Sequence, residues 1–197
     1  IIPDRIEAAT FLIAGAMAGD KVRIKGARED HLTALLGKLE AAGAVMKRYE
    51  EAIEISRPSA ILPVDVITAP YPDCPTDLQA QWIAFMTQAE GSSVIRDDIY
   101  VDRFAHVPEL VRLGARISLE GNTATIEGPT ELVGAPVMST DIRASASLVL
   151  AALVAKGTSE ISRVYHLDRG YETIEKKLTA LGARMERVAD DRRLQKG

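Results

Sequence analysis

Residues 141–161 read DIRASASLVLAALVAKGTSEI. Asp141 and Arg143 begin a run that is apolar almost throughout, which predicts a buried helix with charged residues at its N-terminus. An aspartate there caps a helix, because its carboxylate accepts hydrogen bonds from free backbone amides and its charge suits the positive helix end. Gly157 predicts the end of the helix, since glycine tolerates a left-handed conformation. A short strand is expected next.

The same pattern occurs twice more, in DRIEAATFLIAGAMAGDKVRI (residues 4–24) and DLQAQWIAFMTQAEGSSVI (residues 77–95). From Asp to Gly the spacing is 15, 14 and 16 residues (4 to 19, 77 to 91, 141 to 157). A second helical module follows each time, and its glycine comes 24, 23 and 25 residues after the first (19 to 43, 91 to 114, 157 to 182). These near-constant spacings predict three copies of one supersecondary unit.

Each unit is predicted to run helix, strand, helix, strand, strand, which gives an α/β (α+β) fold. The first helix is apolar on most sides and is expected to be buried all round. The second is amphipathic, with its apolar positions facing inward; in the third unit these are Ile174, Leu178 and Leu181. We therefore expect a bundle of three inner helices with sheet and helix outside. If the inner helices run side by side, their N-termini gather at one end and form an anion site.

The repeats predict a single domain over residues 1–188, with units at about 1–70, 71–136 and 137–188. Units one and two close with a further strand-like run, LPVDVITAP and LVGAPVMST, whereas unit three leads into ADDRRLQKG. Residues 189–197 are therefore expected to be a polar tail, and the missing strand predicts an open sheet edge. Because the chain starts inside an apparent element and without methionine, we interpret it as a fragment.

Composition restricts the classes of partner. The 197 residues are 47% hydrophobic and 26% charged, which is typical of a soluble globular protein. A net charge of −4 gives no electrostatic case for binding nucleic acid or an anionic membrane, so an anionic ligand needs locally placed arginines. No apolar run is long enough to span a bilayer, and no signal peptide is visible. The single cysteine, Cys74, is compatible with a cytoplasmic location.

Five stretches carry a resemblance to a known family: IPDRIEAATF, PTDLQAQ, RFAHVPELVRLGA, TDIRASASLVLAALVAKGT and YHLDRGYE. Together, from Ile2 to about Val188, they resemble the UDP-N-acetylglucosamine 1-carboxyvinyltransferase family, the enolpyruvyl transferases of peptidoglycan synthesis. The resemblance implies one of two similar domains, each an inside-out α/β barrel of three units, with the active site between them. It implies transfer of enolpyruvyl from phosphoenolpyruvate to the 3-hydroxyl of UDP-N-acetylglucosamine, without a metal or organic cofactor.

The domain that this chain lacks carries the family's catalytic cysteine on a mobile loop. Cys74, in YPDCPTD, does not match that loop, so the cysteine role is not transferred to it. The fragment is therefore expected to be inactive alone and to need the second domain as a partner. Two alternatives remain: an enzyme like 3-phosphoshikimate 1-carboxyvinyltransferase, and a non-catalytic module that binds a UDP-sugar or a partner.

The resemblance implies that Asp77, in PTDLQAQ, contacts the sugar hydroxyl and acts as the general base. A carboxylate within hydrogen-bond reach can accept the hydroxyl proton; from position alone, Asp77 is predicted to cap a helix. Arg143 is unfavourable at a positive helix end unless a carboxylate or a bound anion offsets it. Substrate binding by Arg143 and Asp141 is one possibility, and an ion pair between the two is the other.

The resemblance implies that Arg169, in YHLDRGYE, is a catalytic and substrate-binding residue, because it matches the family arginine that contacts phosphoenolpyruvate or helps to close the cleft. Arg103 occupies the same place in unit two and is a further candidate for binding the substrate. Ile99 matches an apolar residue that touches the uridine portion, although alone it would be interpreted as strand core. The three histidines lack any metal-ligand spacing, so no metal site is predicted.

Overall fold

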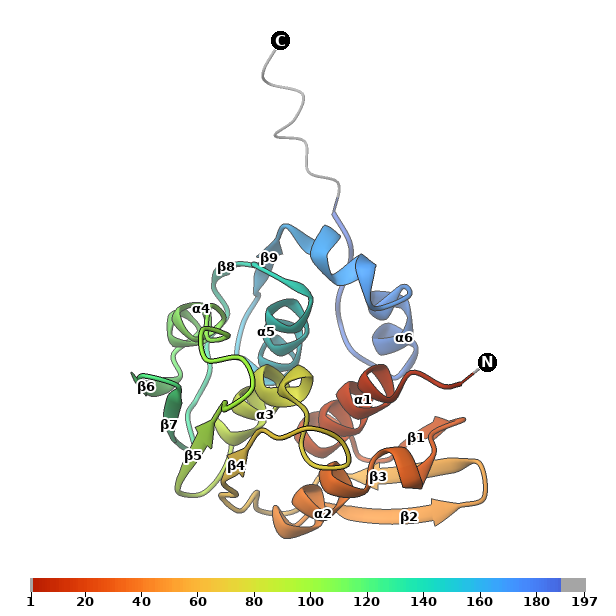
Figure 1. Cartoon of the computed structure of the whole chain (residues 1–197). Coiled ribbons are helices and arrows are strands. Elements are labelled where there is room, and N and C mark those ends of the chain that lie inside the picture. Colours follow the sequence, from red (N-terminus) through yellow and green to blue (C-terminus); the bar gives the residue numbers. More distant parts are fainter. Residues whose placement is uncertain (1, 189–197) are drawn as a thin grey trace.

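The computed structural model describes residues 2–188, so the predicted polar tail lies outside the described residues. Three helices occupy the middle of the molecule: α1 (Arg5–Ala18), α3 (Gln79–Met86) and α5 (Ile142–Val154). They pack against one another, and the sheets and remaining helices surround them (Figure 1). The predicted bundle of inner helices is therefore confirmed.

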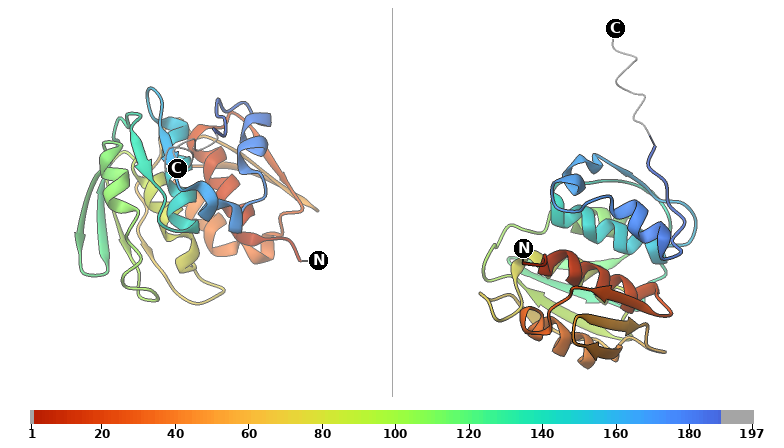
Figure 2. Two further views of the ribbon diagram at one scale, coloured as in Figure 1. Left: turned by 90° about the horizontal axis from the view of Figure 1, so that it is seen from above. Right: turned by 90° about the vertical axis from the view of Figure 1, so that its right-hand side faces the viewer.

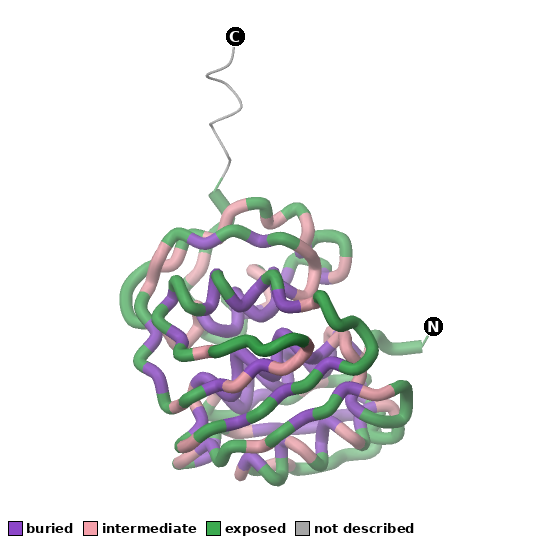
Figure 3. The backbone as a smooth tube through the Cα atoms, turned by 60° about the vertical axis from the view of Figure 1, so that its left-hand side comes forward, coloured by how far each residue is buried: buried purple, intermediate pink, exposed green. Residues whose placement is uncertain are grey.

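Burial of the inner helices follows from their apolar sequences. Every residue of α3 is buried, and α1 and α5 are buried over 8–17 and 144–151, as the purple stretches of Figure 3 show. The prediction that α5 is buried all round is wrong for its last turn, where Leu153 and Val154 are only partly buried. This turn lies at the edge of the bundle, next to the exposed Lys156 and Gly157.

The first unit surrounds α1 with one antiparallel sheet in the order β1-β3-β2. Helix α2 turns Leu35, Leu36 and Leu39 toward the core, as its amphipathic pattern predicts. The elements are β1 (Val22–Lys25), the 3-10 turn η1 (Glu29–His31), α2 (Thr33–Ala41), β2 (Val45–Tyr49) and β3 (Ala52–Ser56).

The second unit contributes to a four-stranded sheet in the order β4-β5-β7-β6. Its hairpin joins β6 to β7 with Glu120 opposite Thr123, so Gly121 and Asn122 form a tight turn. The edge strand β4 (Val66–Ile67) is the closing strand of the first unit. The elements of the second unit are the 3-10 turn η2 (Thr76–Leu78), β5 (Ser92–Arg96), α4 (Val107–Arg112), β6 (Arg116–Glu120) and β7 (Thr123–Glu127).

A two-stranded parallel sheet pairs β8 (Pro136–Met138), the closing strand of the second unit, with β9 (Glu160–Ser162) of the third. The third unit continues with the 3-10 helix η3 (Val164–Arg169) and α6 (Ile174–Ala180). No strand follows α6 within residues 181–188. Leu181, which was predicted to face inward, is 52% exposed, because these residues provide no sheet on which it could pack. Helix α6 lies beside α1, where Lys177 Nζ is 2.7 Å from Glu7 Oε1 (Figure 2).

The closing strand of each of the first two units pairs with the next unit. Strand β4 pairs in parallel with β5, and β8 pairs in parallel with β9. The repeats are therefore tied together by shared sheets as well as by the inner helices.

The C-terminal ends of the inner helices meet at one end of the molecule. Residues 57–61 bridge the ends of α1 and α3, and residues 130–134 bridge the ends of α3 and α5. The bonds are Arg57 N to Gly19 O, Glu90 N to Ile61 O, Thr130 N to Thr87 O and Gly134 N to Lys156 O. Because the three C-terminal ends lie together, the three N-termini share the opposite rim.

Glycines mark the same turn in each unit. Gly43, Gly114 and Gly182, which follow α2, α4 and α6, have φ angles of +91°, +98° and +101°. At the end of α1 the prediction of a left-handed glycine is wrong, since Gly19 has a φ of −93°. Its bare Cα is needed for close packing instead: a Cβ there would lie 2.6 Å from Val22 Cγ2.

None of the helices within residues 2–188 combines the length and the apolar character needed to cross a bilayer.

Candidate active site

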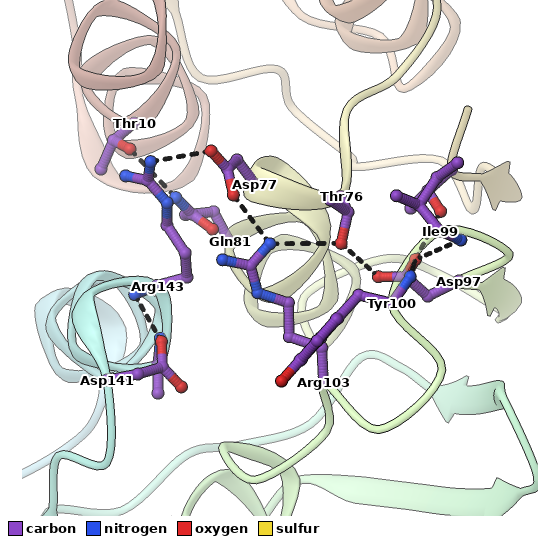
Figure 4. Close-up of polar contacts among 12 residues, drawn as sticks. Thr10, Thr76, Asp77, Gln81, Asp97, Ile99, Tyr100, Arg103, Asp141 and Arg143 are labelled. Atoms are coloured by element: carbon purple, nitrogen blue, oxygen red, sulfur yellow. Dashed lines mark hydrogen bonds and ion pairs between the residues drawn. The ribbon is translucent and has the colours of Figure 1, made fainter. Parts of the chain in front are cut away.

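Asp77 lies in η2, directly before the first turn of α3. Its carboxylate accepts from Arg103 Nη1 at 2.7 Å and from Arg143 Nη2 at 2.9 Å (Figure 4). The predicted helix cap is wrong, because the 3-10 turn displaces the residue and α3 begins without a side-chain cap. Burial by itself raises the pKa of the Asp77 carboxyl, but the hydrogen bonds and charges of Arg143 and Arg103 outweigh it and hold the pKa below its ordinary value.

Arg143 projects from the first turn of α5, and only 18% of its side chain is exposed. Asp141 caps this helix, as predicted, by accepting from Arg143 N at 2.7 Å and from Ala144 N at 2.9 Å. The alternative of an Asp141–Arg143 ion pair is therefore wrong: Asp141 holds the backbone of Arg143, while the guanidinium reaches Asp77. The charge that offsets this arginine at a positive helix end comes from another repeat.

Arg103 approaches the same carboxylate from the loop before α4. Its Nη1 also donates to Thr76 Oγ1 at 3.2 Å, and its guanidinium lies 5.6 Å from the ring centroid of Tyr100. With Asp77 and Arg143 it forms a cluster of two cations and one anion. The cluster keeps a net positive charge, which suits it to bind an anion.

Asp97, at the end of β5, organises the loop that carries Arg103. Its fully buried carboxylate accepts from Thr68 Oγ1 at 2.6 Å, Thr76 Oγ1 at 2.7 Å, and the backbone N–H groups of Ile99 (3.0 Å) and Tyr100 (2.9 Å). Ile99 is consequently 48% exposed in a loop, so its interpretation as strand core is wrong. Sequence reasoning missed Asp97; its signal is an aspartate directly after the strand run VIR, where Asp side chains hydrogen-bond the turn that follows.

Arg169 ends η3 and is exposed, and its side chain makes no hydrogen bond or ion pair within residues 2–188. Its neighbour Gly170 packs on the first turn of α5, where an added Cβ would lie 2.9 Å from Ile142 Cγ2. The structure thus brings Asp77, Arg103 and Arg143 into direct contact. It places the Arg169 backbone at the start of α5, without contact between its side chain and the cluster.

A buried polar group beneath the rim was also missed. Tyr171 Oη lies 2.8 Å from Thr10 Oγ1, and Gln81 Nε2 donates to both oxygens at 3.3 Å. These residues come from the third, first and second units respectively, and each side chain is almost fully buried. The polar positions within otherwise apolar helices were the available signal.

The three histidines and the cysteine were also weighed as candidates for chemistry. His31, His106 and His166 belong to η1, the start of α4 and η3, and in the described part of the chain no three His, Cys, Asp or Glu side chains could together hold a metal ion. Cys74 is buried, which raises the pKa of its thiol to about 11 and keeps it protonated at neutral pH.

Residues 1–178 match the family model of EPSP synthase (3-phosphoshikimate 1-carboxyvinyltransferase). Proteins named UDP-N-acetylglucosamine 1-carboxyvinyltransferase from Chlorobaculum parvum and Thermodesulfovibrio yellowstonii are 55% and 54% identical to this chain, over 93% and 95% of its length. The matches cover 43% and 45% of those relatives, so the chain spans less than half of their length.

Solved structures agree on the fold. The enolpyruvyl transferase NikO from Streptomyces tendae superposes with a TM-score of 0.86 at 30% identity, over 93% of this chain and 44% of NikO. EPSP synthase from Acinetobacter baumannii superposes with a TM-score of 0.71 at 15% identity, over 95% of this chain and 44% of that protein, which is evidence for the fold alone. The predicted fold class is confirmed by these structures.

Proposed function

Since the chain belongs to the EPSP synthase (3-phosphoshikimate 1-carboxyvinyltransferase) family, we propose that it forms half of an enolpyruvyl transferase. The reaction moves the enolpyruvyl group of phosphoenolpyruvate to the 3-hydroxyl of UDP-N-acetylglucosamine, releases phosphate and yields a peptidoglycan precursor. The observation that carries this proposal is the Asp77 carboxylate held between Arg103 and Arg143 at the shared rim of three helix N-termini.

Asp77 accepts the hydroxyl proton as the sugar oxygen bonds to C2 of the enolpyruvyl group. C3 gains a proton at the same time from the thiol of the family's catalytic cysteine, which the second domain supplies, and a tetrahedral intermediate results. Return of a proton from C3 to that thiolate, together with departure of phosphate, then restores the double bond. Arg143 and Arg103 neutralise the carboxylate and phosphate of phosphoenolpyruvate, for which the bidentate guanidinium fork is suited.

The resting ion pairs couple the two substrates. A carboxylate held at 2.7 and 2.9 Å by two guanidinium groups is a weak base. An anion that engages either arginine competes with Asp77 for its hydrogen bonds, and this raises the proton affinity of the carboxylate. Binding of phosphoenolpyruvate therefore prepares Asp77 to accept the proton.

Three further residues complete the proposed half-site. The exposed Arg169 binds phosphoenolpyruvate, because its guanidinium makes no hydrogen bond or ion pair with any described residue. Ile99 offers an exposed apolar surface for the uridine portion. Asp141 acts on substrate binding through Arg143, whose backbone it fixes.

The UDP-sugar is favoured over 3-phosphoshikimate by the apolar loop beside Arg103. Ile99, Tyr100 and Val101 are 48%, 58% and 54% exposed. A small anionic carbocycle offers little apolar surface that could pack against these side chains. The second domain supplies the opposite wall of the cleft and is the required partner. We propose a cytoplasmic location, with which the single buried cysteine is compatible.

The test is phosphate release from phosphoenolpyruvate by a protein that joins this chain to its second domain. We expect turnover with UDP-N-acetylglucosamine, none with 3-phosphoshikimate, and none from residues 1–197 alone. Turnover with 3-phosphoshikimate and none with UDP-N-acetylglucosamine would contradict the proposed substrate and favour 3-phosphoshikimate in its place. Calorimetry that shows UDP-N-acetylglucosamine binding, together with a joined protein that lacks turnover, would instead favour a non-catalytic binding module.

A further inference from the structure

Tyr171 connects all three units beneath the rim. It lies in the turn after η3, two positions beyond Arg169, and its side chain reaches Thr10 in α1 and Gln81 in α3. Only 2% of the residue is exposed. A single phenol oxygen therefore joins the third unit to the two helices that flank the Asp77 cluster.

The directions of these hydrogen bonds can be assigned by counting protons. Thr10 Oγ1 donates its only proton to Ile6 O at 2.9 Å, so it must accept from Tyr171 Oη at 2.8 Å. Gln81 Nε2 donates to Tyr171 Oη at 3.3 Å. The phenol proton is thus committed to Thr10, and the phenol oxygen is left as an acceptor toward the remainder of the site.

An acceptor is what Arg143 requires. Its guanidinium has five N–H donors and no acceptor, is 18% exposed, and uses Nη2 on Asp77. Burial raises the pKa of the Tyr171 phenol, and the hydrogen bond with Thr10 and the positive charge of Arg143 only partly offset that increase. Gly170, which precedes Tyr171, packs on Ile142, which precedes Arg143, so the two chain segments lie together at the start of α5.

Tyr171 also anchors the turn that bears Arg169. The backbone N–H groups of Gly170 and Tyr171 both donate to Leu167 O, at 3.1 and 2.9 Å. Gly170 packs against Ile142, directly before Arg143. Fixing the phenol consequently fixes the backbone on which Arg169 stands.

We propose that Tyr171 is a positioning residue, which holds Arg143 and the Arg169 turn in the geometry that binds the anionic second substrate. This inference rests on the proposed function. It adds a residue that touches neither substrate and acts through two arginines.

The test compares Tyr171→Phe with Tyr165→Phe in the protein that joins this chain to its second domain. Tyr165 is a matched control because it is 51% exposed and its described contact is with the His166 ring. We expect Tyr171→Phe to raise KM for phosphoenolpyruvate about tenfold, as for the loss of the buried hydrogen bond between Tyr171 and Thr10. KM for UDP-N-acetylglucosamine should change by less than about twofold, within the variation expected of a surface substitution, and Tyr165→Phe should change neither KM.

An unchanged KM for phosphoenolpyruvate would overturn the inference, as would equal increases in both KM values. If Tyr171→Phe does not fold, Thr10→Val removes the same hydrogen bond from the other side and should give the same selective change. A joined wild-type protein without turnover would contradict the proposed function instead. The inference would then be judged by calorimetry with phosphoenolpyruvate, where equal affinities of the wild type and Tyr171→Phe would overturn it.

Discussion

Asp77 and Arg143 stand 66 positions apart and form an ion pair of 2.9 Å between Oδ2 and Nη2. One residue precedes the inner helix of the second repeat, and the other lies in the first turn of the inner helix of the third. The pair exists because the repeated helices run parallel and present their N-termini on one rim. The same rim brings Arg103 to the other carboxylate oxygen at 2.7 Å.

The Asp77–Arg143 pair should contribute measurably to stability. A double-mutant cycle with Asp77→Asn and Arg143→Met is expected to give a coupling energy of about 0.5–1 kcal/mol, because Arg143 is mostly buried while Asp77 is partly exposed. Urea unfolding of the four proteins measures it. As a control, the Lys156–Glu131 pair is 70% and 66% exposed and should couple more weakly. Equal coupling in the two pairs would contradict the structure.

Buried His106 should make stability depend on pH between 7 and 5. Burial lowers the pKa of this imidazole to about 4, with opposing contributions from Asp141, which raises it, and Arg103, which lowers it. The unfolded chain therefore binds the proton first, and stability falls as the pH drops below about 6.5.

The loss by pH 5 is expected to be about 2 kcal/mol, and His106→Gln should remove it. Denaturant unfolding at pH 7, 6 and 5 provides the comparison. A pH slope that survives in His106→Gln would show that another group is responsible. Carboxyl groups with lowered pKa values, such as Asp77, lose their contribution only at more acidic pH.

Two glycines of the same repeat should respond oppositely to alanine. Gly43 has a φ of +91°, and an added Cβ would lie 3.3 Å from Ala60 O, so Gly43→Ala should destabilise by about 1–2 kcal/mol. Gly37 lies inside α2 with nothing within 4 Å of its Cβ position, so Gly37→Ala should stabilise by about 0.5–1 kcal/mol. Thermal unfolding of both variants gives the sign directly. A stabilising Gly43→Ala would contradict the left-handed turn.

The thiol of Cys74 should react slowly with alkylating reagents in the folded protein. Because burial raises the pKa of its thiol to about 11, labelling by iodoacetamide at pH 8 should be slow in the native protein and fast in urea. Cys74→Ala should retain turnover when this chain is joined to its second domain. Rapid native labelling accompanied by loss of turnover would reopen the question of a nucleophile here.

The repeat and the burial of its inner helices could be predicted from sequence, because both depend on local periodicity. The spacing of Asp and Gly located all three inner helices, and the apolar runs showed that they are enclosed. The same periodicity wrongly predicted that Leu181 is buried. Burial of this side chain would need a sheet to pack against, and residues 181–188 form no strand. The prediction that a left-handed glycine ends each inner helix failed at Gly19. There, close packing against Val22, and not the backbone conformation, requires a glycine.

Contacts within the candidate site could be predicted only in part. Sequence and resemblance together singled out Asp77, Arg103 and Arg143, but not which of them meet. Local reasoning offered an ion pair between Arg143 and the nearby Asp141. In the structure, Asp141 accepts a hydrogen bond from the backbone N–H of Arg143, and the Arg143 guanidinium pairs with Asp77. Tyr171 and Asp97 were missed, because their partners come from distant parts of the chain.

The most direct test is the turnover number of Asp77→Asn in the protein that joins this chain to its second domain. If Asp77 is the base at a rim assembled from three repeats, kcat should fall by about 10²–10⁴-fold while circular dichroism stays unchanged. Asp168→Asn is the matched control, since that carboxylate is also held by two guanidinium nitrogens, at 2.9 and 2.7 Å from Arg187, but on the surface; it should keep kcat within about twofold. Near-normal turnover of a folded Asp77→Asn protein would contradict the proposed site.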